Sequence, residues 1–81
     1  MNVRVLSFAR VREVLSSGQM TLDLADGATA ADLWSALERG CPPLRELAAS
    51  TRIARNGRVV DGCEPLRDGD EIALLPPVGG G

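Results

Sequence analysis

The sequence has no histidine, no lysine and no tyrosine, and it has 2 cysteines. Histidine is the usual general base and, with cysteine, the usual zinc ligand. Its absence excludes Ser-His and Cys-His catalytic pairs and zinc-type ligand sets. Cys41 and Cys63 lie far apart, outside any Cys-x-x-Cys motif, and are expected to be reduced, at least partly packed thiols. We therefore expect no metal site and no enzyme that acts alone, because acid–base catalysis would have to come from partners.

Aromatic residues and long apolar runs are also scarce. Phe8 and Trp34 are the aromatic side chains, and the formal charge is −2, with 9 basic and 11 acidic residues in no single block. A nucleic-acid interface needs a basic stripe, preferably with aromatics, so no nucleic-acid partner is expected. Nothing resembles a signal peptide or a transmembrane run, which predicts a cytoplasmic protein without a membrane partner.

Hydrophobic spacing predicts a short strand, a short helix and a second strand at the start of the chain. Residues 2–8 carry apolar side chains at both odd and even positions, as a central strand buried on both faces would. Residues 9–16 change to helical spacing. Residues 20–24 alternate between apolar and polar side chains, which indicates a half-buried strand.

The main helix is predicted to begin at Thr29, with Asp32 placed to complete a capping box. Trp34 lies on the apolar stripe of this helix and is expected in the core. Gly40 is expected to stop the helix, and residues 44–50 are expected to add a short helical turn.

The second half of the chain reads as a hairpin followed by a last strand. Asn56-Gly57 tolerates the positive φ angles of a type I′ turn between residues 52–55 and 58–60. Residues 71–75 form the last strand, which Pro76-Pro77 ends. A first and a last strand that are both central, with one helix over one face, predict an α+β roll.

The chain ends in Val78, Gly79, Gly80 and Gly81 after the two prolines. Glycine has no Cβ, so such a segment passes through channels too narrow for side chains and leaves a terminal carboxylate open to attack. Extended, it spans roughly 13 Å at about 3.3 Å per residue. We predict a domain over residues 1–77 and a flexible tail over residues 78–81.

Three segments resemble the small subunit of molybdopterin synthase, a family of ubiquitin-like β-grasp sulfur carriers. Residues 8–13 are similar to the family's Phe-Ala-x-x-Arg-Glu segment. Residues 55–57 are similar to its Val-Asn-Gly turn, with Arg55 as a departure. Residues 65–81 are similar to its Pro-Leu-x-Asp-Gly-Asp-Glu segment and its Pro-Pro-Val-x-Gly-Gly ending.

This resemblance implies a ubiquitin-like β-grasp fold with a mixed sheet and one main helix on one face. It also implies that an ATP-dependent, ubiquitin-activator-like enzyme adenylates Gly81, and that a sulfurtransferase or cysteine desulfurase system converts the adenylate to a thiocarboxylate. Gly79 and Gly80 would thread into the large synthase subunit, where Gly81 gives its sulfur to cyclic pyranopterin monophosphate to form molybdopterin. No cofactor is bound permanently, since ATP is consumed by the partner.

The resemblance places partner contacts at Phe8, Arg12, Leu75, Pro77 and Val78. For Phe8 and Leu75 the alternative interpretation is that they fill the core, and for Arg12 that it is a solvated helix residue. A sulfur carrier for thiamine, cysteine or tRNA thiolation shares the fold and the diglycine. A ubiquitin-like protein modifier, or an interaction domain with an inert tail, is a further alternative.

Overall fold

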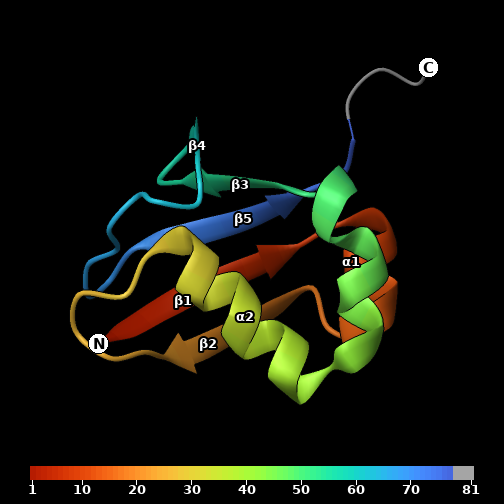
Figure 1. The fold of residues 1–81 in the computed structure, drawn as a ribbon, viewed down its shortest axis with the longest axis horizontal. Helices are drawn as coiled ribbons and strands as arrows, with labels where there is room; N and C mark the ends of the chain where they lie inside the picture. The colour runs from red at the N-terminus through yellow and green to blue at the C-terminus, as the bar shows by residue number, and fades with distance from the viewer. Residues whose placement is uncertain (78–81) are drawn as a thin grey trace.

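A five-stranded mixed sheet forms the centre of the computed structural model, which describes residues 1–77. The strand order is β2–β1–β5–β3–β4, with β1 and β5 parallel and all other neighbours antiparallel (Figure 1). The strands are β1 Asn2–Ser7, β2 Gln19–Asp23, β3 Arg52–Arg55, β4 Arg58–Val60 and β5 Glu71–Leu75. The helices are α1 Ala9–Leu15, α2 Ala30–Gly40 and the 3₁₀ helix η1 Pro42–Ser50. The predicted α+β roll, with its first and last strands in the middle of the sheet, is confirmed.

Strand β1 is central but buried on only one face, so the prediction of a strand buried on both faces is wrong. Val3, Val5 and Ser7 are buried, whereas Asn2 and Arg4 are exposed. In Figure 1, α2 crosses one face of the sheet, and α1 and η1 lie at its end. None of the helices within residues 1–77 covers the opposite face, and we call it the open face.

Helix α2 begins with the predicted capping box. The Asp32 backbone amide donates to the Thr29 hydroxyl (3.3 Å), and the Thr29 amide donates to the Asp32 carboxylate (2.9 Å). The helix ends at Gly40, as predicted, although Gly40 is not among the residues with positive φ. Cys41 caps the helix by donating its backbone amide to the Leu37 carbonyl (2.9 Å), and the polypeptide then turns into the Pro-Pro start of η1.

The predicted hairpin between β3 and β4 is confirmed. Asn56 and Gly57 have φ angles of 49° and 88°, as a type I′ turn requires of both central residues. Residues predicted to add a short helical turn belong to η1, which begins earlier, at Pro42.

The core lies between the sheet and the helices. Trp34, predicted to lie in the core, is half-buried at its edge, and its indole nitrogen donates to Glu38. No helix within residues 1–77 is long and apolar enough to cross a lipid bilayer. The buried members of the core are Val3, Val5, Val11, Leu33, Leu37, Leu44, Leu66, Ile72 and Leu74.

Candidate functional site

Strand β5 carries the chain toward the residues that the sequence singles out most strongly. It lies between β1 and β3, and its last residue, Leu75, is followed by the exposed Pro76 and Pro77. Val78 and the three terminal glycines lie outside the described residues. The described part of the site is therefore the surface around the end of β5.

Phe8 lies beside that end and belongs to the surface. It directly follows β1. The parallel register pairs Ser7 with Leu74, so Phe8 and Leu75 occupy the next positions along the two strands. Its backbone is extended (φ −135°, ψ 158°), which continues the strand's alternation and directs the side chain to the open face. The side chain is 43% exposed. The interpretation of Phe8 as a core residue is wrong.

Leu75 also faces away from the core. Leu74 is fully buried, and the neighbouring Ala73 and Leu75 are half-buried residues of the opposite face. Neither Ala73 nor Leu75 packs with the core cluster. Phe8 and Leu75 thus lie on the same face, at the point where β5 ends.

A row of apolar residues continues this surface across four strands. The sheet register aligns Leu6 with Ala73, Ala73 with Ala54, and Ala54, which is only 5% exposed, with Val59. Val59 is 52% exposed, and it is absent from the set of residues that the sequence predicted. The sequence could have predicted its position, because the two-residue turn at Asn56-Gly57 fixes the pairing of Val59 with Ala54. We call Leu6, Phe8, Val59, Ala73 and Leu75 the apolar patch.

Arg12, another predicted contact residue, lies on the helix that follows Phe8. Arg12 is exposed on α1, one turn from Phe8, and its backbone amide donates to the Phe8 carbonyl (3.3 Å). Its side chain covers Gly18, where an added Cβ would lie 3.2 Å from the Arg12 Nε. Arg12 therefore packs over the turn before β2, which is a local structural contact that sequence reasoning did not foresee.

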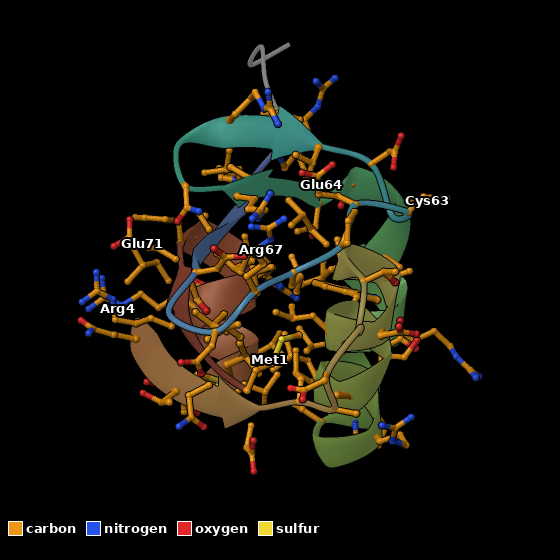
Figure 2. The ribbon with its side chains drawn as sticks, turned by 90° about the vertical axis from the view of Figure 1, so that its left-hand side faces the viewer. Met1, Arg4, Cys63, Glu64, Arg67 and Glu71 are labelled. Atoms are coloured by element: carbon orange, nitrogen blue, oxygen red, sulfur yellow. The ribbon has the colours of Figure 1, made fainter. Side chains whose placement is uncertain are left out.

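Charged side chains on the strands flank the patch. Arg4 and Glu71 pair with each other, and Figure 2 shows both pointing away from the helical layer. Asp23, farther along the same face, lies 3.5 Å from the amino terminus. Arg52 is aligned with Leu75 across the β3–β5 pair and is exposed. Among residues 1–77, Arg52 has no ion-pair partner.

The opposite end of β5 is fixed by a buried carboxylate. Asp70 is 6% exposed and accepts hydrogen bonds from Arg55 Nε (2.7 Å), the Arg67 amide (2.7 Å) and Asn56 Nδ2 (2.9 Å). Burial alone would raise the pKa of Asp70, but these hydrogen bonds outweigh it and hold the pKa below its ordinary value. Arg55 also pairs with Glu64 (3.0 Å), and the pKa of Arg55 is raised, chiefly by its hydrogen bond with Asp70.

This arrangement suits docking to a protein better than binding a small molecule. The apolar patch lies on a sheet face, and a cleft of about 420 Å³ lies elsewhere, between α2 and η1. No group of three His, Cys, Asp or Glu side chains within the described residues could hold a metal ion. Cys41 is half-buried, while Cys63 is exposed, so the expectation of a packed thiol is wrong for Cys63.

Comparisons with known proteins agree with this fold over almost the whole chain. The model of the ThiS family matches residues 5–81. A curated relative from Chlamydomonas reinhardtii, named molybdopterin synthase sulfur carrier subunit, is 37% identical over 83 residues and covers 100% of both chains.

Solved structures give the same result. The crystal structure of SAMP1 from Haloferax volcanii matches with a TM-score of 0.88 at 30% identity, covering 100% of both chains. One chain in the complex of subunits 1 and 2 of molybdopterin-converting factor from Helicobacter pylori also matches. Its TM-score is 0.72 at 30% identity, and the match covers 100% of both chains. The fold is the ubiquitin-like β-grasp, as the sequence resemblance implied.

Proposed function

This chain belongs to the ThiS family, and from that premise we propose that it is the sulfur carrier subunit of a molybdopterin synthase. The observation that carries the proposal is the position of the end of β5. That strand is the middle one of the five, and it ends at the half-buried Leu75, beside the exposed Phe8. A partner that covers these side chains would receive the glycine tail in the same encounter. Curated relatives with this function match the chain over its full length.

The chemistry that we propose resides at the Gly81 carboxylate. A carboxylate is a poor electrophile until a leaving group is attached, so one carboxylate oxygen attacks the α-phosphorus of ATP and releases pyrophosphate. Sulfur at the oxidation level of sulfide then displaces AMP and leaves a thiocarboxylate. This group is a good sulfur nucleophile, and it gives its sulfur to cyclic pyranopterin monophosphate, after which water restores the Gly81 carboxylate.

The partners divide this work with the chain. A ubiquitin-activator-like enzyme supplies ATP chemistry, and the large subunit supplies the pterin site. A sulfurtransferase or cysteine desulfurase supplies persulfide sulfur, which a thiol reduces to the oxidation level of sulfide as it is oxidised to a disulfide. Phe8, Leu75, Pro77 and Val78 would bind the large subunit, and the absence of a Cβ would let Gly79, Gly80 and Gly81 enter its active site. The H. pylori structure is a complex of subunits 1 and 2 of molybdopterin-converting factor, which supports such a pairing. The dependence on ATP favours the cytoplasm as the location.

A protein modifier is the second candidate function. The relative from Haloferax volcanii named small archaeal modifier protein 1 is 35% identical over 82 residues, covering 91% of this chain. Conjugation would use the same adenylate and end in an isopeptide bond to a target lysine. A blot of native cell extract for this chain separates the two functions, because a modifier gives covalent ladders and a dedicated carrier gives one band.

The proposal is tested by altering the tail alone. We expect that deletion of Gly81, or addition of one residue after it, abolishes molybdopterin formation in a reconstituted synthase. Circular dichroism should show an unchanged fold, because the core lies within residues 3–74. Full activity of the chain without Gly80 and Gly81 would refute the proposal. Rescue of a thiamine auxotroph without rescue of molybdoenzyme activity would assign the carrier to another pathway.

A further inference from the structure

Arg52 is a charged residue of the open face that lies opposite the last residue of β5. Ile53 packs against the core, so the alternation of β3 turns Arg52 and Ala54 to the other side of the sheet. Arg52 is aligned directly with Leu75. Side chains opposite each other on neighbouring strands have Cβ atoms about 4.5–5.5 Å apart. Any surface that covers Leu75 therefore meets Arg52 as well.

The other charges on this face are already compensated within the chain. Arg4 pairs with Glu71, and Asp23 lies 3.5 Å from the amino terminus. Arg52 has no acidic partner within residues 1–77. Covering an unpaired arginine with an apolar surface would remove it from water without compensation, at a cost that opposes binding.

From this juxtaposition we infer that Arg52 is a specificity contact, which binds a carboxylate that the large subunit presents beside its apolar binding surface. The inference rests on the proposed function and adds a feature that the apolar patch alone does not supply. Apolar surfaces attract one another with little discrimination, whereas a paired charge favours a partner with an acceptor in the right place and disfavours one without it. Guanidinium is suited to this role because it binds carboxylates through two parallel hydrogen bonds.

The test is a titration of the full chain with purified large subunit at low and high salt. Arg52→Ala should weaken binding about tenfold at low salt, and its affinity should depend less on salt than that of the wild type. Arg52→Lys should retain most of the salt dependence, because it keeps the charge. Arg45→Ala is the matched control, since Arg45 is exposed on η1 in the helical layer. It should bind like the wild type.

The results separate this inference from the proposed function. If the wild type binds and acquires a thiocarboxylate, but Arg52→Ala matches Arg45→Ala in affinity and in salt dependence, the inference about Arg52 is wrong and the carrier function stands. If the wild type does not bind the large subunit at all, the proposed function fails and the inference fails with it. Circular dichroism of each variant ensures that binding is compared between folded chains.

Discussion

At the scale of single residues, the Ser7 hydroxyl is notable because it is buried without a hydrogen-bond partner among residues 1–77. The residue is 2% exposed and faces the core at the end of β1. A buried hydroxyl that lacks a partner loses its hydrogen bonds to water and gains none in return. We expect Ser7→Ala to raise the free energy of unfolding by ~1 kcal/mol, measured by denaturant unfolding.

Ser50→Ala is the control for this prediction. The Ser50 hydroxyl is exposed and donates to the Leu47 carbonyl (3.3 Å), so its removal should bring no gain in stability. Destabilisation by Ser7→Ala would contradict the prediction, because it would mean that the hydroxyl has a partner in solution.

Phe8 illustrates what the sequence leaves open at this scale. Its type and its place after the first strand are visible in the sequence, but its exposure depends on which face of the sheet the helix covers. A strand buried on both faces explains the apolar residues as well as a strand buried on one face does; these residues are Val3, Val5, Leu6 and Phe8. Burial of one face only, with Ser7 inside, follows from tertiary packing that local sequence does not encode.

At the scale of elements, Asp70 connects the β3–β4 turn with the turn that begins β5. Its carboxylate holds Arg55, Asn56 and the Arg67 amide, and Asn56 Oδ1 in turn accepts from the Glu71 amide (2.9 Å). Because the pKa of Asp70 is lower in the folded state, the folded state favours its ionised form. Its contribution to stability is therefore present above the unfolded pKa of about 3.9 and is lost as the pH falls through the lower, folded pKa.

Asp70→Asn should therefore lower the free energy of unfolding by ~2 kcal/mol at neutral pH. The difference between variant and wild type should begin to narrow below about pH 4, where Asp70 becomes protonated in the unfolded wild type, and it should continue to narrow until the pH passes the lower, folded pKa. Denaturant unfolding across a pH series measures this. Glu46→Gln, at an exposed position on η1, is the control and should keep the wild-type pH profile. A gap between Asp70→Asn and wild type that stays constant down to pH 2 would exclude this account of Asp70.

Features that depend on residues close together in the sequence are predicted well, whereas contacts between distant segments are not. The capping box of α2 and the Asn56-Gly57 turn depend on neighbours within a few residues, and both are confirmed. The role of Arg55 is not local, because its partners Glu64 and Asp70 come from the loop before β5 and meet it only in the fold. Arg55, which replaces the family's valine, thus has a structural role in pairing with Glu64 and Asp70 that the motif alone does not predict.

At the scale of the whole molecule, one face of the sheet supports the core and the other is available for docking. Phe8→Ala should weaken large-subunit binding by at least about tenfold, because burial of such a side chain contributes roughly 1.5–3 kcal/mol. Phe8→Leu should retain most of the affinity, since it keeps most of the apolar area. Titration calorimetry measures both variants, and circular dichroism confirms that each is folded.

The salt dependence of the affinity tests whether the apolar patch or charge drives binding of the large subunit. With a net charge of −2, long-range steering is weak, and raising the salt concentration should change affinity less than Phe8→Ala does. If salt weakens the complex strongly while Phe8→Ala binds like the wild type, the arginines carry the interface and the patch does not.

Intact-protein mass spectrometry can detect whether the molecule carries sulfur on Gly81. The chain is incubated with its adenylating enzyme, ATP and a sulfur donor, and a reaction without ATP serves as the control. We expect a mass increase equal to the exchange of one oxygen for one sulfur, which fragmentation assigns to the C-terminal peptide and which requires ATP. An unchanged mass in the complete reaction, or sulfur located on Cys41 or Cys63 and not on Gly81, would contradict this expectation.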